Sequence, residues 1–121
     1  MDREPLYAEA LHVNSSFLTA VANDYGYEEV YSRMVAAKGQ KGDVLLALST
    51  SGNSSNVLKA IEQANLIGMI TIGFSGSDGG QMKDICKYNL IVSSSNTARI
   101  QEAHILVGHI ICKLIEQKIF N

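Results

Sequence analysis

Apolar residues along this chain form short continuous runs that alternate with runs at helical spacing. The clearest continuous run is Val-Leu-Leu-Ala-Leu at 44–48, and similar runs follow at 69–74 and 88–92. Runs that are apolar throughout, rather than at every second position, are typical of strands buried on both faces. The pattern therefore predicts three strands of a parallel sheet. A weaker strand is predicted over 8–13, where Glu9 interrupts the apolar positions.

Helical spacing of apolar residues separates these predicted strands. It predicts helices after the cap Asn14-Ser15-Ser16, over about 27–37, from about residue 56, over about 82–86 and over about 97–119. For the first of these, β-branched residues leave a strand as an alternative. Parallel strands separated by helices predict an α/β fold with three layers, in which helices cover both faces of a doubly wound sheet. The last helix has an apolar side formed by Ile100, Ala103, Val107, Ile110, Ile111, Leu114 and Ile115.

Length and composition limit the class of protein. A chain of 121 residues, 46% of them hydrophobic, is expected to form one domain over 1–121. The net charge is −2 without a basic run, which argues against nucleic acid or a membrane surface as partner. No run is apolar enough to span a bilayer, and the first residues do not resemble a signal peptide, so a cytoplasmic protein is expected. Cys86 and Cys112 are expected to be reduced core residues.

The most informative polar segment is 49–54, Ser-Thr-Ser-Gly-Asn-Ser, between the strand predicted at 44–48 and the following helix. The hydroxyls of Ser49, Thr50, Ser51 and Ser54 can donate to phosphate oxygens, and Gly52 would let the backbone approach a ligand closely. Free N–H groups at the start of a helix add partial positive charge. This combination favours a site for a phosphorylated small molecule. The alternative is that these residues only cap the helix, because serine and asparagine are common N-caps.

Three polar segments are expected to meet at one edge of the sheet. Ligands of parallel α/β sheets bind at the carboxyl ends of the strands. The loop 49–54 follows one strand and the glycine-rich loop 78–80 follows the next, while Asn23 and Asp24 lie in an earlier turn. We expect these segments to line a common pocket.

Segments 22–30, 42–54 and 97–104 together make the chain resemble the bacterial phosphoheptose isomerases, which are sugar-isomerase (SIS) domain proteins. The similarity runs in order from about residue 5 to residue 120. Ser-Thr-Ser-Gly-Asn-Ser alone occurs in many SIS domains. Its combination with Asn-Asp-Tyr-Gly at 23–26 and Arg-Ile-Gln-Glu at 99–102 is more specific.

The resemblance implies an activity and roles for individual residues. Members interconvert sedoheptulose 7-phosphate and D-glycero-D-manno-heptose 7-phosphate, which supplies the core of lipopolysaccharide. By similarity, the phosphate is held by Ser49, Thr50, Ser51 and Ser54. Asn23 and Asp24 would contact the substrate, Gln101 would bind substrate and zinc, and His109 would bind zinc and transfer a proton. An alternative is a non-catalytic SIS module that binds a sugar phosphate or a protein such as the replication initiator.

Helix geometry complicates the zinc assignment. Gln101 and His109 are about 12 Å apart along one helix and differ in direction by about 80°, whereas zinc bonds are about 2.0–2.2 Å long. Either their side chains lean together or the ligands come from different subunits. Without the resemblance, a histidine on an apolar helix is more often a buried residue bonded to a backbone carbonyl, and His104 is assigned that role.

The resemblance and the last helix also predict assembly and an incomplete domain. The helix is apolar on more than one side, which predicts a homo-oligomer with sites near subunit interfaces, and the family forms tetramers. Family members carry a further N-terminal strand, a Gly-Asn-Gly-Gly-Ser loop and a helix with a histidine and a glutamate, none of which is found here. The chain is therefore expected to be N-terminally truncated, with an exposed sheet edge and exposed apolar faces.

Overall fold

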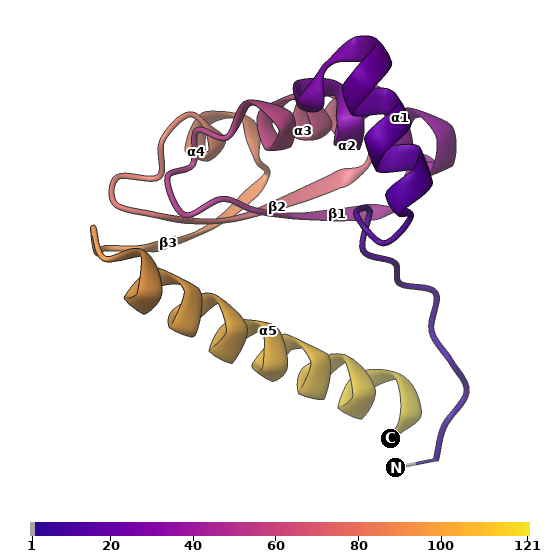
Figure 1. Cartoon of the computed structure of the whole chain (residues 1–121). Helices are drawn as coiled ribbons and strands as arrows, with labels where there is room; N and C mark the ends of the chain where they lie inside the picture. Colours follow the sequence, from indigo (N-terminus) through magenta and orange to yellow (C-terminus); the bar gives the residue numbers. More distant parts are fainter. Residues whose placement is uncertain (1) are drawn as a thin grey trace.

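Three parallel strands lie at the centre of the computed structural model, which describes residues 2–121 (Figure 1). The helices α2–α4 lie above the sheet in this view and α5 lies below it, as the three-layer prediction expected, while α1 packs against η1 and α2 to one side. In chain order the elements are α1 (Ser15–Tyr25), the 3-10 helix η1 (Tyr27–Glu29), α2 (Val30–Lys38), β1 (Val44–Leu48), α3 (Ser55–Ile67), β2 (Ile70–Gly76), α4 (Met82–Ile85), β3 (Tyr88–Val92) and α5 (Thr97–Phe120).

The sheet has the order β1-β2-β3, and all its pairs are parallel. The last residue of β1, Leu48, pairs with Phe74 of β2, whereas β2 continues to Gly76, which pairs with Val92 of β3. The sequence predicted that this strand would end at Phe74. It extends further because Ser75 and Gly76 are buried and remain paired with β3. The carboxyl end of β2 therefore passes beside the loop that follows β1.

The hydrophobic core lies between the sheet and the helices α2, α3 and α4. Alternate residues of β1 face it, because successive strand residues point to opposite sides of a sheet. Ile61 of α3 and Met82 of α4 have no exposed surface. The cluster of buried residues consists of Val35, Leu45, Ala47, Ala60, Ile61, Ala64, Met82 and Cys86.

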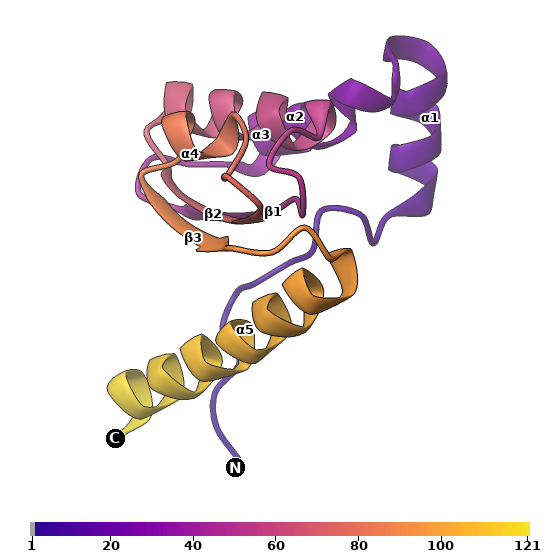
Figure 2. The same cartoon turned by 90° about the vertical axis from the view of Figure 1, so that its left-hand side faces the viewer.

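Much of the opposite face of the sheet lies open. The β1 residues that point to it, Val44, Leu46 and Leu48, are between 44% and 56% exposed. Helix α5 meets this face only near its start and then runs away from it, as Figure 2 shows. Of the seven apolar residues expected on one side of this helix, Ile100 alone is buried. The spacing of apolar residues identifies the apolar side of a helix, but it does not indicate whether other parts of the same chain cover that side.

The strand predicted over residues 8–13 is wrong. This segment is extended and turns at residues 11–12, and it pairs with no strand. Of this segment Leu11 alone packs against the core. Glu9 forms an ion pair with Lys38, with 2.6 Å between Glu9 Oε1 and Lys38 Nζ. The bond from Lys38 keeps the pKa of the Glu9 carboxyl below its usual value. The backbone N–H and C=O groups of a strand need hydrogen-bond partners on a neighbouring strand, and no strand of the sheet pairs with residues 8–13.

The structure also bears on the cysteines and on membrane insertion. Cys86 is a buried core residue, as predicted, and burial raises the pKa of its thiol. Cys112 is exposed on α5, so its assignment to the core is wrong, because α5 has no buried residue after His104 and runs away from the sheet. Over residues 2–121, no helix is both long and apolar enough to cross a bilayer.

Candidate functional site

The loop 49–54 joins the end of β1 to the start of α3 and is folded around the side chain of Ser49. The Oγ atoms of Ser49 and Ser54 lie 2.8 Å apart, and the Ser51 Oγ lies 3.4 Å from that of Ser49. The backbone N–H of Ser49 donates to the carbonyl of Phe74, so the loop begins as a continuation of the sheet. These bonds gather three hydroxyls at the carboxyl end of a parallel strand, where the sequence predicted an anion site.

The N-cap residue of α3 makes no side-chain capping bond. Ser54 occupies the N-cap position but makes no capping bond, whereas Asn14 caps α1 by accepting from Phe17 N at 3.0 Å. Asn96 likewise accepts from two backbone N–H groups at the start of α5. The capping alternative for the serines therefore does not describe Ser54. In the first turn Val57 N donates to Asn56 Oδ1 at 2.9 Å, which leaves the N–H groups of Ser55 and Asn56 without a side-chain acceptor among residues 2–121. These two N–H groups and the helix dipole favour an anion at this position.

A second loop supports the serine loop from behind. Met82 N donates to the carbonyl of Gly52 at 3.1 Å, and Gln81 N donates to the side chain of Asn53 at 2.9 Å. Gly52 has φ +68°, and a Cβ placed on it would lie 2.1 Å from the carbonyl oxygen of Gly79. From the sequence, Gly52 was predicted to let the backbone approach a ligand closely. The close approach is instead to the loop 79–80, which is why both sides of this contact are glycine.

The supporting loop is itself fixed by an aspartate. Asp78 Oδ1 accepts from Gly80 N at 2.9 Å, and Lys83 Nζ donates to the Asp78 carbonyl. The Gly80 bond, with the nearby charge of Lys83, keeps the pKa of the Asp78 carboxyl below its usual value. Loops 49–54 and 78–80 thus meet as predicted, but loop 78–80 supports the serine loop from behind and does not line the cavity.

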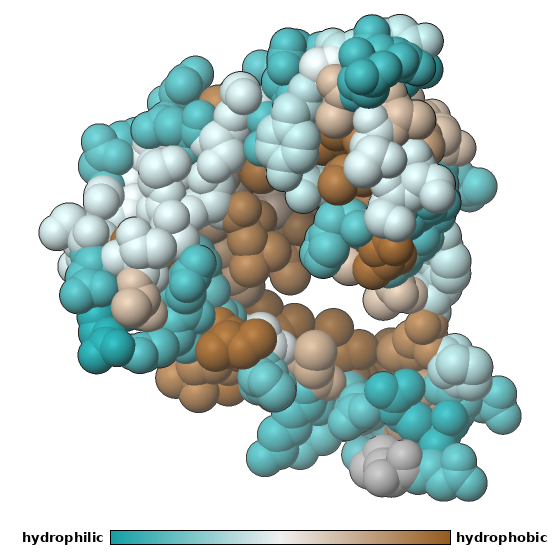
Figure 3. All heavy atoms as spheres, viewed as in Figure 1, coloured by the Kyte–Doolittle hydropathy of each residue, from teal (hydrophilic) through white to brown (hydrophobic). Residues whose placement is uncertain are grey.

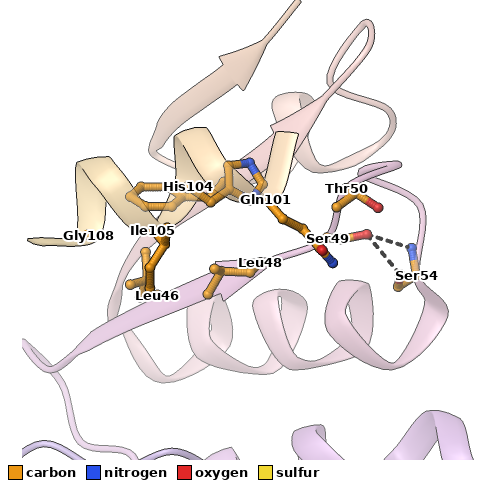
Figure 4. Close-up of a pocket in the computed structure, with 10 residues that line it drawn as sticks. Leu46, Leu48, Ser49, Thr50, Ser54, Gln101, His104, Ile105 and Gly108 are labelled. Atoms are coloured by element: carbon orange, nitrogen blue, oxygen red, sulfur yellow. Dashed lines mark hydrogen bonds between the residues drawn. The ribbon is translucent and has the colours of Figure 1, made fainter. Parts of the chain in front are cut away.

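A cavity of about 640 Å³ lies between the serine loop, the open face of the sheet and the first turns of α5 (Figure 4). Hydrophobic residues surround the hollow between the sheet and this helix in Figure 3. The cavity is polar at the loop and apolar along the sheet. Its lining residues are Leu46, Leu48, Ser49, Thr50, Ser54, Phe74, Gln101, His104, Ile105 and Gly108.

Two side chains of α5 face this cavity from opposite the serine loop. Gln101 extends toward Ser49 and Thr50 in Figure 4. His104 is 4% exposed, and its Nε2 donates to the carbonyl of Ser75 at 2.8 Å. The prediction that His104 is a buried histidine bonded to a carbonyl is confirmed. Its place in the cavity was missed, although its spacing of three residues from Gln101 on one helix was a usable signal.

The other residues predicted for the site do not line this cavity. Asn23 and Asp24 are exposed at the end of α1, where the Asn23 side-chain amide donates to Asp24 at 2.9 Å. Ser51 is exposed and accepts from Asn53 N, and His109 is exposed on α5 next to the lining residue Gly108. Their roles in binding or catalysis stay predictions. One chain thus brings together Ser49, Thr50, Ser54 and Gln101.

The residues of one chain do not fit a zinc site. Among residues 2–121 no group of three or more histidine, cysteine, aspartate or glutamate side chains is close enough to hold a metal ion. Gln101 lines the cavity while His109 does not. Protein zinc sites take three or four ligands, so Gln101 and His109 would need donors from outside this chain.

The fold and the serine loop at the end of β1 match a known class: the chain belongs to the SIS domain family, whose model matches residues 1–76. Within that class it is similar to phosphoheptose isomerases. It is 51% identical over 121 residues to that of Clostridium acetobutylicum and 55% identical over 117 residues to that of Helicobacter pylori. It covers 62% and 61% of their lengths, so it spans about three fifths of these relatives.

Solved structures of the same class share the fold. A phosphoheptose isomerase from Francisella tularensis matches 95% of this chain and 62% of its own, with a TM-score of 0.92 and 40% identity. The phosphoheptose isomerase of Neisseria gonorrhoeae matches 90% of this chain and 61% of its own, with a TM-score of 0.88 and 45% identity. The resemblance inferred from the sequence is therefore confirmed.

Proposed function

We propose that this chain forms part of an aldose–ketose isomerase that interconverts sedoheptulose 7-phosphate and D-glycero-D-manno-heptose 7-phosphate, a step toward the heptose of lipopolysaccharide. The observation that carries the proposal is the serine loop beside the start of α3, where the N-cap Ser54 makes no capping bond, with Gln101 facing it across the cavity. The names of the similar proteins support the choice of reaction. We also propose a cytoplasmic location, which two free cysteines suit.

The serine loop would hold the substrate phosphate. The hydroxyls of Ser49, Thr50 and Ser54 donate to its oxygens, and the first N–H groups of α3 add the helix dipole. Ser51 stands at the rim, where its hydroxyl would reach a ligand that fills the loop. The sugar would then extend along the cavity toward Gln101, whose amide can both donate to and accept from a hydroxyl or carbonyl.

The reaction moves a proton between C1 and C2 through an enediol, so it needs a base, an acid and a group that stabilises the developing oxyanion. We assign proton transfer to His109, which is exposed on α5 next to the lining residue Gly108. Its exposed position implies that another chain or segment closes the site around it. Asn23 and Asp24 would also reach the substrate only through such a contact. No step is assigned to zinc.

The reaction is tested by following sedoheptulose 7-phosphate by NMR, with and without added zinc. We expect the aldose to appear, and we expect His109→Ala to abolish its formation. His12→Ala is the matched control, because His12 is also an exposed histidine but lies in the segment before α1 and not on α5. Equal turnover in His109→Ala and the unaltered chain would refute the assignment of His109.

One observation favours a second function, a non-catalytic SIS module that binds a sugar phosphate or a protein such as the replication initiator. The cavity lining contains no aspartate or glutamate among the residues that the structure describes, so one chain offers no carboxylate as base. In the NMR experiment this function predicts that the sugar resonances broaden on binding while no aldose forms.

We propose that the protein is a homo-oligomer that assembles through α5 and the open face of the sheet. Large apolar side chains on α5 stay exposed, including Leu106 at 60% and Leu114 at 57%. Contiguous exposed apolar surface of this kind is typical of protein interfaces. Tetramers, as in the family, would also bring cavity residues of different copies together.

Replacing Ile110 with glutamate is expected to weaken this assembly. Ile110 is 48% exposed on α5, and burying a carboxylate without a partner at an interface costs several kcal/mol, about 10- to 1000-fold in the association constant. Sedimentation velocity over a concentration series measures the shift toward monomer. Gln117→Glu adds the same charge to α5 without removing an apolar group and should leave the association nearly unchanged. Equal effects of both variants would argue against an interface at Ile110.

A further inference from the structure

The attachment of α5 to the sheet depends on two buried side chains. Ile100 and His104 are the buried residues of this helix, and none of the described residues after His104 is buried. Ile100 packs against Gly76, where an added Cβ would lie 2.3 Å from the Ile100 Cδ1 atom. This contact is apolar and short-range, so it holds the helix close to β2. An apolar contact does not by itself fix the rotation of the helix about its axis.

His104 supplies the directional contact. Its Nε2 donates to the backbone carbonyl of Ser75 at 2.8 Å, and its ring lies 5.5 Å from the ring of Phe74, tilted by 47°. A hydrogen bond weakens steeply when its angle departs from linear. Because the carbonyl belongs to a strand, this bond holds α5 at one rotation relative to the sheet.

Gln101 lies three residues before His104, on the same side of the helix. Its side chain extends across the cavity toward Ser49 and Thr50, but no hydrogen bond to another side chain holds it there in the structure of residues 2–121 (Figure 4). The position of Gln101 relative to the serine loop is therefore determined by the position of the helix backbone. That position in turn depends on the bond from His104 to β2.

We propose that His104 is a positioning residue that holds Gln101 opposite the phosphate-binding serine loop. The proposal rests on the proposed function, because it concerns the binding of a sugar phosphate in that cavity. His104 acts through the helix and needs no contact with the substrate. The distance between the phosphate site and Gln101 is then set by the buried hydrogen bond from His104 on α5 to Ser75 on β2.

Two substitutions separate the hydrogen bond from the bulk of the ring. His104→Phe keeps an aromatic ring against Phe74 but removes the donor to Ser75. His104→Gln keeps a side-chain N–H that can reach the same carbonyl. We expect His104→Phe to weaken the affinity for sedoheptulose 7-phosphate about tenfold, and His104→Gln to restore most of it. Gln117→Phe controls for adding an aromatic ring to α5 at an exposed position outside the proposed interface.

A double-mutant cycle with Gln101→Ala identifies the route of the effect. If His104 acts through Gln101, His104→Phe costs no further affinity once Gln101 has been replaced. A His104 that merely stabilised the domain would weaken binding by the same factor in both backgrounds. Equal factors, or unchanged affinity in His104→Phe, would overturn the proposal.

A measurement without ligand keeps the two proposals distinguishable. In the unaltered chain and in His104→Gln, we expect NMR cross-peaks between the Gln101 side-chain amide and protons of Leu48 or Ser49. His104→Phe should lose these cross-peaks while the strand resonances stay in place. Their absence in the unaltered chain, or their persistence in His104→Phe, refutes positioning by His104. Failure of the unaltered chain to bind sedoheptulose 7-phosphate, with these cross-peaks behaving as expected, refutes the proposed function alone.

Discussion

Replacing Gly52 with alanine is expected to abolish measurable binding of a sugar phosphate. The new Cβ would lie 2.1 Å from the Gly79 carbonyl oxygen and 3.0 Å from Gly80 N, so the serine loop must move away from the loop behind it. That movement breaks the bond from Met82 N to the Gly52 carbonyl and displaces the three hydroxyls gathered around Ser49. A displacement of about 1 Å in a binding site can cost about 100-fold. Titration with sedoheptulose 7-phosphate, followed by NMR, measures the loss.

Gly42→Ala is the matched control for this substitution. Gly42 also has a positive φ, +90°, but an added Cβ there meets no atom within 4 Å. Both alanines pay about 1–2 kcal/mol for a left-handed backbone, and only the one at Gly52 collides with another loop. Equal losses of affinity in the two variants would mean that backbone strain, and not the contact between the loops, governs the site.

Ile61→Ala is expected to lower the free energy of unfolding by about 3–5 kcal/mol, a large part of the stability of a domain this size. Ile61 lies on α3 with no exposed surface, at the centre of the core between this helix and the sheet. Its loss leaves a cavity that the surrounding side chains fill only in part. Denaturation by urea, followed by circular dichroism, measures the change.

Leu66→Ala serves as the comparison on the same helix, because Leu66 is 83% exposed. Its substitution should change the stability by less than about 0.5 kcal/mol. If Ile61→Ala proved as mild as Leu66→Ala, the core would not lie between α3 and the sheet.

The sequence predicted the strands and helices well where each has a partner inside this chain. The strands at 44–48 and 88–92 have the predicted bounds, because continuous apolar runs identify buried strands directly. The strand at 8–13 fails because a short apolar run carries no information about a neighbouring strand. The apolar side of α5 was correctly found, but the sequence could not indicate that the sheet would leave most of it exposed.

The site could be predicted only in part for a similar reason. The serine loop was found because its hydroxyls and its glycine are adjacent in the sequence. The support from loop 79–80 and the bond of His104 to Ser75 depend on contacts across 27 or more positions, which no local pattern encodes. The side of α5 on which His104 lies could be inferred from its spacing to Gln101. Asn23, Asp24 and His109 were predicted for the site from the resemblance, and they do not line the cavity of this chain.

The extended N-terminal segment gives α5 a second attachment of a different physical kind. Arg3 forms an ion pair with Glu116 at 2.7 Å and lies over the ring of Phe120, near the far end of the helix. The near end is held by a buried hydrogen bond and by apolar packing, which salt hardly affects. Salt weakens an ion pair whose side chains are both about one third exposed, and the weakening grows as the screening length falls from about 8 Å at physiological ionic strength to about 3 Å at 1 M. Raising the ionic strength should therefore loosen the attachment of the distal half of α5 and leave the half beside the cavity in place.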